Sequence, residues 1–243
     1  MKKRLDLKVQ ELYPQYSRRQ IQSWIMQGRV TVDGHAASKV GMQVADEQAI
    51  VLDVDEPKYV SRAGFKLEKA LTHFGLSVHG LVALDAGLST GGFTDCLLQH
   101  GVQKVYGIDV GYGQVHEKIR HDERVVVLER TNLRHLTHVG EKVDLVTLDL
   151  SFISVLLVMN AVKALLKKDD GMLIVLIKPQ FEAERHDIGR GGIIKDSLIH
   201  EKVTEKVTKA IVAEGFTLVG ITDSPILGSE GNKEFLAVFK RIS

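Results

Sequence analysis

The hydrophobic and polar positions follow different patterns in two parts of the chain, and the change falls near residue 58. Beyond it, short apolar runs bounded by glycine or acids alternate with stretches whose apolar residues recur at helical spacing. The runs predict strands at 82–86, 105–109, 125–128, 143–148 and 172–177, and the stretches around them predict helices from Ser61 to about Phe74, Thr94 to about His100, Ser154 to Leu166 and Asp196 to Gly215. Strands that alternate with helices favour a mostly parallel sheet with right-handed crossovers.

Two further strands are predicted at 216–221 and 235–239, and the connection between them is too short to hold a crossover helix. These strands are therefore expected to pair antiparallel. The predicted class for residues 58–243 is α/β, a Rossmann-like doubly wound sheet with an antiparallel last strand.

Residues 1–57 predict a small α+β domain followed by an acidic linker. A first helix over 5–12 ends before Pro14, and Ser17 with Gln20 forms a capping box for a second helix that ends at Gly28. Strands are predicted at 30–32 and 50–52, with Asp33-Gly34 as a tight turn after the first of them. Segment 53–57 holds three acids and a proline, which indicates a linker and places the domain boundary after residue 57.

The formal charge of +1 conceals an uneven distribution. Residues 1–45 carry eight Lys and Arg against three acids, whereas residues 46–57 carry five acids and no Lys or Arg. Such a basic cluster is typical of phosphate contacts, although a solvated charged face explains it equally well. The candidate RNA-binding residues are Arg4, Arg18, Arg19, Arg29, Lys39 and Arg62.

Residues 82–95 carry the strongest functional signal. The strand ends at Asp85-Ala86, and glycines 87, 91 and 92 follow with a Gly-x-x-x-Gly-Gly spacing that differs from the dinucleotide fingerprint. A second acid, Asp109, ends the next strand. Two strand-end acids beside such a loop favour a cofactor with a ribose and no phosphate, and S-adenosylmethionine is that cofactor; the alternative is an ordinary α/β domain with glycine turns. The candidate cofactor-binding residues are Asp85, Gly87, Ser89, Thr90, Gly91, Gly92, Phe93, Asp109, Asn132 and Asp149.

Functional groups converge at one edge of the predicted sheet. Asp85, Asp109 and Asp149 each follow or end a strand, and Lys178 comes directly after the strand at 172–177. The carboxyl ends of parallel strands are where open α/β sheets bind ligands. Segment 180–195 is rich in glycine and charge, so it suits either a substrate lid or a disordered loop.

Composition excludes several other classes. One cysteine allows no internal disulfide and no thiolate metal cluster, and the ten histidines form no zinc pattern, so no metal is expected. No apolar run reaches the roughly 18 residues of a membrane span. We expect a cytoplasmic protein that has no membrane partner.

The order of these motifs resembles known families. Arg4-Leu5-Asp6, residues 16–21 and Gly28 to Gly34 resemble the α-L RNA-binding motif named after a small-subunit ribosomal protein. The whole chain resembles the TlyA family of ribosomal RNA 2′-O-methyltransferases, whose class I sheet also ends in an antiparallel strand. The motifs that carry this resemblance are residues 59–66, 85–95, 107–114, 149–154, 177–182 and 231–236. Leu88 departs from the family pattern, in which a small residue is expected.

The resemblance implies a function and an active site. By similarity to the TlyA family and to FtsJ-like RNA ribose methyltransferases, Lys66, Asp149, Lys178 and Glu234 match a Lys-Asp-Lys-Glu catalytic tetrad. The implied reaction is S-adenosylmethionine-dependent 2′-O-methylation of a cytidine ribose in ribosomal RNA, with Lys178 as the base or as the partner of the alkoxide. Amine methylation would favour an Asn/Asp-Pro-Pro-aromatic run where residues 149–152 stand, and cytosine C5 methylation would need a nucleophilic cysteine.

Two other classes stay open on sequence alone, a non-catalytic RNA-binding assembly factor and a membrane-active hemolysin, the label that many relatives carry. Shorter relatives are associated with the large ribosomal subunit, and this chain looks short at both ends. Modification of large-subunit RNA is therefore the expectation. The oligomeric state is left open.

Overall fold

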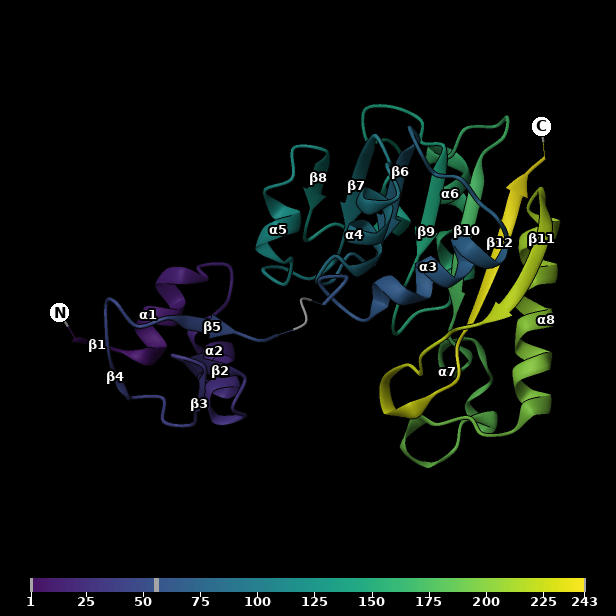
Figure 1. The fold of residues 1–243 in the computed structure, drawn as a ribbon. Helices are drawn as coiled ribbons and strands as arrows, with labels where there is room; N and C mark the ends of the chain where they lie inside the picture. The colour runs from purple at the N-terminus through teal and green to yellow at the C-terminus, as the bar shows by residue number, and fades with distance from the viewer. Residues whose placement is uncertain (1, 55–56, 243) are drawn as a thin grey trace. The chain divides into compact units, whose positions relative to one another are not determined.

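A computed structural model describes residues 2–54 and 57–242, apart from the side chains of Arg190 and Ser229. The chain divides into two compact units, residues 1–57 and residues 58–243 (Figure 1). Each unit buries a hydrophobic core of its own.

The N-terminal unit contains two helices, α1 (Leu5–Leu12) and α2 (Arg18–Met26), and two small sheets. One sheet has the order β3 (His35–Ala37), β2 (Val30–Val32) and β5 (Ile50–Leu52), and the other pairs β1 (Lys2–Arg4) with β4 (Gln43–Ala45). The predicted capping box is present at Ser17 and Gln20. Asp33 and Gly34 both have positive φ, as a two-residue turn between β2 and β3 requires.

The second unit is built on a seven-stranded sheet with the order β11-β12-β10-β9-β6-β7-β8. Its strands are β6 (Val82–Ala86), β7 (Lys104–Ile108), β8 (Val125–Leu128), β9 (Leu145–Leu148), β10 (Met172–Ile177), β11 (Phe216–Asp223) and β12 (Phe235–Arg241). β12 runs antiparallel to both of its neighbours, and the pairs from β10 to β8 are parallel. This confirms the predicted α/β class and its antiparallel last strand.

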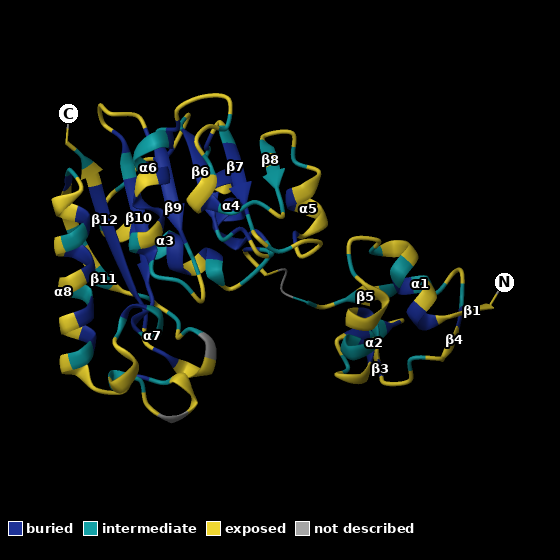
Figure 2. Cartoon of the chain, turned by 180° about the vertical axis from the view of Figure 1, so that it is seen from behind, coloured by how far each residue is buried: buried dark blue, intermediate teal, exposed yellow. Residues whose placement is uncertain are grey.

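Helices cover both faces of this sheet. The helices are α3 (Ala63–His73), α4 (Gly92–Gln99), α5 (Glu117–Arg120), α6 (Met159–Leu165), α7 (Pro179–Glu182) and α8 (Ser197–Ala213), and short 3₁₀ turns lie at η1 (Leu133–His135), η2 (Val155–Val158), η3 (Arg185–Asp187), η4 (Arg190–Gly192) and η5 (Ser229–Gly231). One core packs α3, α4 and α5 against the sheet, and the other packs α6 and α8. Figure 2 shows the result, with the central strands almost wholly buried and α8 exposed along one side.

The strand and helix boundaries differ from the sequence prediction in several places. The strand predicted at 143–148 begins at Leu145, because Val143 forms an isolated bridge with Leu166 instead. The helix predicted from Ser154 is divided into η2 and α6, and the one predicted from Thr94 begins at Gly92. The short helix α5 was not predicted.

Segment 180–195 has regular structure in α7, η3 and η4, so the disordered-loop interpretation is wrong. Asn232, in the loop before β12, anchors it, because its Oδ1 accepts from the Ile194 amide at 3.1 Å and its Nδ2 donates to the Gly192 carbonyl at 3.0 Å. A lid function for this segment stays a prediction.

Candidate active site

The glycine loop after β6 ties three strand ends together. The amides of Gly87 and Leu88 both donate to the Ile108 carbonyl at the end of β7, at 2.9 and 3.0 Å, and the Asp149 amide donates to Ala86 at 2.9 Å. Gly87 has φ +88°, and a Cβ there would overlap the carbonyl oxygen of Asp149. Only glycine fits this close approach of the loop to the end of β9.

Asp109 links this loop to the loop after β7. Its two carboxylate oxygens accept from the amides of Ser89 and Gly111, each at 2.7 Å. Ser89 has φ +48°, a left-handed conformation that the hydrogen bond to Asp109 helps to hold. Asp109 therefore holds two loops at the rim of the site, and each of its carboxylate oxygens can still accept a hydrogen bond from a ligand.

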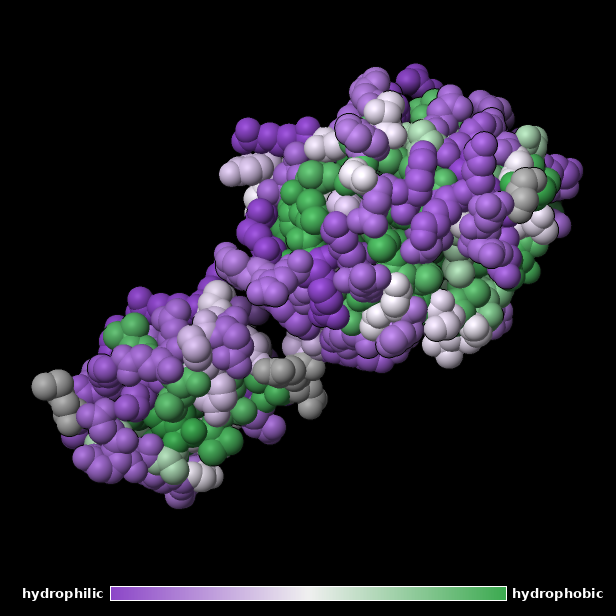
Figure 3. Space-filling model, turned by 90° about the horizontal axis from the view of Figure 1, so that it is seen from above, coloured by the Kyte–Doolittle hydropathy of each residue, from purple (hydrophilic) through white to green (hydrophobic). Residues whose placement is uncertain are grey.

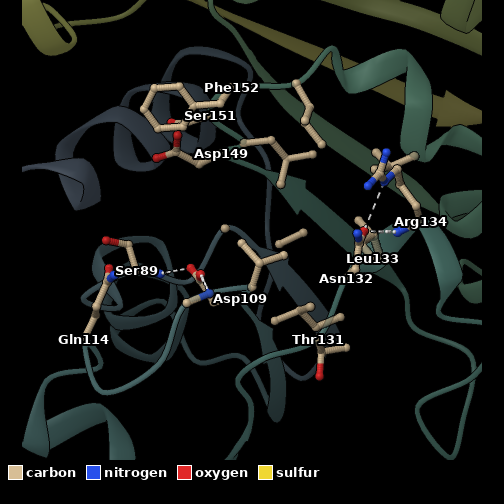
Figure 4. A pocket seen from close by; sticks show the side chains of 18 residues that line it. Ser89, Asp109, Gln114, Thr131, Asn132, Leu133, Arg134, Asp149, Ser151 and Phe152 are labelled. Carbon is tan, nitrogen blue, oxygen red and sulfur yellow. Dashed lines mark hydrogen bonds between the residues drawn. The ribbon is translucent and has the colours of Figure 1, made fainter.

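A cavity of about 580 Å³ opens between these loops. Figure 4 shows Asp109 and Ser89 on one side, Asn132 and Arg134 on another, and Asp149, Ser151 and Phe152 across from them. The lining residues are Ala86, Gly87, Ser89, Ile108, Asp109, Val110, Gly111, Gln114, Thr131, Asn132, Leu133, Arg134, Asp149, Leu150, Ser151, Phe152, Ile153 and Val158. A volume in this range suits a ligand of nucleoside size.

Five of the ten predicted cofactor residues line this cavity: Gly87, Ser89, Asp109, Asn132 and Asp149. The other five, Asp85, Thr90, Gly91, Gly92 and Phe93, do not. The side-chain amide oxygen of Asn132 already has partners within the protein, since Oδ1 accepts from the Arg134 amide at 3.0 Å and from Arg134 Nε at 3.3 Å. This leaves its Nδ2 as the group available to a ligand.

Asp85 is a correction to the sequence prediction of a cofactor contact. Successive residues of a strand face opposite sides of the sheet, and Leu84 and Ala86 face the core that contains α6 and α8. The Asp85 side chain therefore faces the α4 side, where it is fully buried and accepts from Thr94 Oγ1 at 2.7 Å and Thr147 Oγ1 at 2.8 Å. Burial raises the pKa of this carboxyl to about 6, against the lowering effect of the two threonines. Asp85 thus links the end of β6 to α4 and β9 beneath the glycine loop.

The remaining loop residues also pack inward. Phe93 belongs to the core around α3 and α4, and the Leu88 side chain is buried against Gly107 in β7. Gly91 has φ +97° at the N-terminus of α4, and Gly92 lies so close to Ser61 that a Cβ would overlap the serine hydroxyl. The bulk of Leu88 therefore fills core space rather than the cavity.

The four predicted catalytic residues form two buried ion pairs. Lys66 Nζ in α3 lies 2.5 Å from Glu234 Oε2, and Lys178 Nζ lies 2.7 Å from Asp149 Oδ1. Side-chain exposure is 10% for both lysines, 2% for Glu234 and 14% for Asp149, so solvent screens these pairs weakly. A Cβ at Gly228 would overlap the Glu234 carboxylate, so this glycine leaves room for the carboxylate.

The sheet brings the pairs to the same edge as the cavity. β10 and β12 pair Ile177 with Phe235, so Lys178, directly after β10, and Glu234, directly before β12, lie at the same end of these antiparallel strands. Asp149 follows β9 on the other side of β10 and lines the cavity. The arrangement sets two lysines and two carboxylates at the edge of the sheet that holds the cavity, and Asp149 lines the cavity itself. A lysine in its neutral form at this edge could accept a proton from a hydroxyl group.

Two polar residues of this region were not singled out from sequence. Ser151 Oγ accepts a hydrogen bond from Lys178 Nζ at 2.8 Å, and the buried Glu182 accepts from Ser154 Oγ at 2.6 Å and from the Val155 amide at 2.7 Å. Burial raises the pKa of the Glu182 carboxyl, against the opposing effect of these hydrogen bonds. Ser151 lies in the same sequence motif as Asp149, residues 149–154, and Glu182 in the same motif as Lys178, residues 177–182. This closeness in sequence to the predicted catalytic residues is the signal that could have identified them.

Cys96 lies within α4 and is fully buried. Burial raises the pKa of its thiol to about 12, so the thiolate is scarce at neutral pH. It does not line the cavity. Cys96 therefore does not meet the requirements of a nucleophile for cytosine C5 methylation.

The predicted RNA-binding residues fall into two groups. Arg4 and Arg18 both bind the buried carboxylate of Asp6, with Nε to oxygen distances of 3.0 Å in each case. Burial opposes ionisation of Asp6, but hydrogen bonds from Arg4, Gln22 and Arg18 hold its pKa below the usual range. Asp6 thereby fixes the two arginines while nearly half of each side chain stays exposed. The second group, Arg19, Arg29, Lys39 and Arg62, is exposed.

Hydrophilic residues predominate on the face of the molecule in Figure 3, and hydrophobic ones form separate patches.

Within residues 2–54 and 57–242, no helix has both the length and the apolar character needed to cross a membrane. In the same residues, no group of three or more His, Cys, Asp or Glu side chains is arranged to hold a metal ion.

Comparison with known proteins assigns both parts of the chain. Residues 59–241 match the FtsJ-like methyltransferase family, and residues 3–50 match the S4 domain. The chain is 42% identical to the 16S/23S rRNA (cytidine-2′-O)-methyltransferase TlyA of Mycobacterium tuberculosis, over 90% of this chain and 82% of that protein. It is 43% identical to Hemolysin A of Brachyspira hyodysenteriae, over 92% of this chain and 93% of that protein. A solved structure from Streptococcus thermophilus that carries a hemolysin name is 40% identical, with a TM-score of 0.75 over 100% of this chain and 89% of that one.

Proposed function

Since the chain belongs to the FtsJ-like methyltransferases and joins that domain to an S4 domain, we propose that it methylates the 2′-oxygen of a cytidine ribose in ribosomal RNA. The protein is a methyltransferase and its cofactor is S-adenosylmethionine. The observation that carries the proposal is the pair of buried ion pairs, Lys66 with Glu234 and Lys178 with Asp149, at the edge that also holds the cavity.

The donor groups of the cavity fit this cofactor. Asp109 has lone pairs left for ribose hydroxyls after binding two backbone amides, Asn132 offers Nδ2 to a purine nitrogen, and Gly87 brings bare backbone to the cavity wall. Bound S-adenosylmethionine supplies an electrophilic methyl group on a positively charged sulfur.

The four side chains of the tetrad have two tasks, proton removal and stabilisation of negative charge. A ribose hydroxyl is a weak nucleophile at neutral pH, so the site must take its proton and hold its oxygen in line. We assign proton acceptance to Lys178 Nζ, which Asp149 holds in place, and stabilisation of the developing negative charge to Lys66 Nζ, which Glu234 holds. The Lys66 ammonium group is nearly excluded from solvent, so its effect on a bound oxygen is large.

The test uses purified ribosomal subunits, labelled S-adenosylmethionine and two lysine variants. Lys178→Ala is expected to lower the rate of methyl transfer by about 10²–10⁴-fold, the usual contribution of a general base, while calorimetry finds cofactor binding retained. Lys209→Ala is the control, because this exposed lysine pairs with Glu205 on the surface of α8. Near-normal turnover by Lys178→Ala would remove Lys178 from the mechanism.

We also propose that residues 1–57 dock on structured RNA and that residues 58–243 carry the chemistry. S4 domains bind RNA, and the arginines that Asp6 fixes present guanidinium groups suited to phosphates. Contacts of this kind position an enzyme on its substrate without reading sequence. A ribosomal substrate implies action in the cytoplasm, and we retain the expectation that the large-subunit RNA is modified.

A further inference from the structure

Lys178 Nζ has two polar partners, and both line the cavity. Nζ forms an ion pair with Asp149 Oδ1 at 2.7 Å and donates a hydrogen bond to Ser151 Oγ at 2.8 Å. Within the residues that the structure describes, Nζ has no third polar partner. Asp149 belongs to the proposed tetrad, whereas Ser151 has no role in it.

The geometry of an amine gives the second partner a meaning. A lysine that accepts a proton must begin as a neutral amine, which has two N–H groups and one lone pair arranged tetrahedrally around nitrogen. If Asp149 alone held Nζ through one N–H, the second N–H and the lone pair could exchange between the two remaining tetrahedral positions. With Ser151 taking the second N–H, the lone pair has a single direction.

The loop that carries Ser151 is held firmly enough to serve this purpose. It contacts α7 on the far side of Ser151 through the rings of Phe152 and Phe181, whose centroids lie 5.1 Å apart. Beyond it, Glu182 binds Ser154 and the amide of Val155. Because α7 begins directly after Lys178, the same short segment holds both the lysine and the loop that bears its partner.

We propose that Ser151 is a positioning residue that aims the lone pair of Lys178 at the substrate hydroxyl. The proposal rests on the function assigned to Lys178 above. In this role Ser151 fixes one N–H of the amine, Asp149 fixes the other, and the 2′-hydroxyl proton passes to the remaining tetrahedral position. Ser151 itself gains and loses no proton.

The kinetic test compares Ser151→Ala with Ser151→Thr, which keeps the hydroxyl. Ser151→Ala is expected to lower kcat about 10- to 100-fold, as misaligned groups do, with KM for the RNA and the dissociation constant of S-adenosylmethionine changed less than about 3-fold. Ser151→Thr is expected to recover most of kcat. Thermal unfolding of both variants checks that the fold is kept.

A pH profile separates aiming from other roles. If Ser151 aims the lone pair, kcat of Ser151→Ala stays low on the alkaline plateau, where the amine is already neutral. Recovery to the wild-type rate at high pH would overturn the proposal, since Ser151 would then act only on proton affinity. Weakened cofactor binding with an unchanged kcat would also overturn it, because Ser151 would then be a cofactor contact.

A second readout does not depend on methyl transfer. In protein carrying ¹³Cε-labelled lysine, the Cε order parameter of Lys178, assigned with Lys178→Arg, is expected to be high in the wild type and lower in Ser151→Ala. Equal order parameters in both proteins would contradict a positioning role. Failure of the wild type to methylate any ribosomal RNA would instead reject the proposed function, and the NMR comparison would still judge the contact.

Discussion

Among single residues, Asp85 makes the sharpest prediction about stability. Its folded pKa of about 6 lies above the usual aspartate value of 3.8, so the folded state binds more protons than the unfolded state between these pH values. Stability contributed by the protonated carboxyl is complete below about pH 4 and is lost as the pH rises through 6. The shift of about two units corresponds to about 3 kcal/mol.

Asp85→Asn removes this dependence, because an amide does not titrate. The free energy of unfolding of the wild type, minus that of the variant, is expected to fall by about 2 kcal/mol between pH 4 and pH 7, which is most of the total. Urea unfolding of both proteins at four pH values measures it, and other titrating groups cancel in the difference. A difference independent of pH would mean that the buried carboxyl is not destabilised.

The same residue illustrates what the sequence predicts at this scale. The strand-end acid before the glycine loop correctly predicts where β6 ends. Because side chains alternate between the two faces along β6, however, the Asp85 side chain points toward Thr94 and away from the cavity. The four residues Lys66, Asp149, Lys178 and Glu234 came from resemblance, and the structure pairs them. Ser151 and Glu182 could not be ranked from one sequence, since their roles depend on a contact between two loops.

At the scale of elements, the apolar runs located the sheet well because buried parallel strands are hydrophobic on both faces. The last two strands could be paired from the length of their connection alone. β1 and β4 were missed, since three-residue strands with polar side chains carry no periodic signal. The break between η2 and α6 could not be predicted either, because the apolar residues recur at helical spacing throughout this segment.

The loop between β6 and α4 gives a prediction with a matched control. Gly80 and Gly87 both have positive φ, but nothing lies within 4 Å of a Cβ at Gly80, whereas a Cβ at Gly87 would overlap the carbonyl of Asp149. Gly80→Ala is expected to cost only the backbone strain, about 1–2 kcal/mol. Gly87→Ala is expected to cost about 2–5 kcal/mol, because overpacking adds to that strain.

Urea unfolding compares the two alanine variants, and calorimetry measures their binding of S-adenosylmethionine. Gly87→Ala is expected to weaken binding as well, since it displaces Asp149 at the cavity wall, whereas Gly80→Ala leaves binding unchanged. Equal losses of stability in the two variants, with equal cofactor affinity, would show that the close approach at Gly87 has no consequence.

At the scale of the whole molecule, each unit contains a complete core. The eight buried hydrophobic residues of the N-terminal core all lie before residue 45, and both cores of the second unit lie beyond residue 58. The acidic segment that suggested a linker includes residues 55 and 56, which lie outside the described residues. Two independent cores imply that neither unit needs the other in order to fold.

A protein of residues 58–243 is therefore expected to unfold cooperatively and to bind S-adenosylmethionine with nearly full affinity. Its kcat/KM on ribosomal subunits is expected to fall at least about 10-fold, because the phosphate contacts of the S4 domain are gone. The full chain with Arg19→Ala, Arg29→Ala and Lys39→Ala is the companion variant and is expected to lose part of the same activity. Full activity of residues 58–243 would show that the first unit is dispensable for substrate docking.

The most direct test of the central claim identifies the methylated nucleoside. Purified large and small ribosomal subunits are incubated with the protein and S-adenosylmethionine, and the RNA is digested to nucleosides for mass spectrometry, with Lys178→Ala as the control. We predict 2′-O-methylcytidine from large-subunit RNA and none from the control. Methylation found on a base, or no new methylated nucleoside from either subunit, would contradict it.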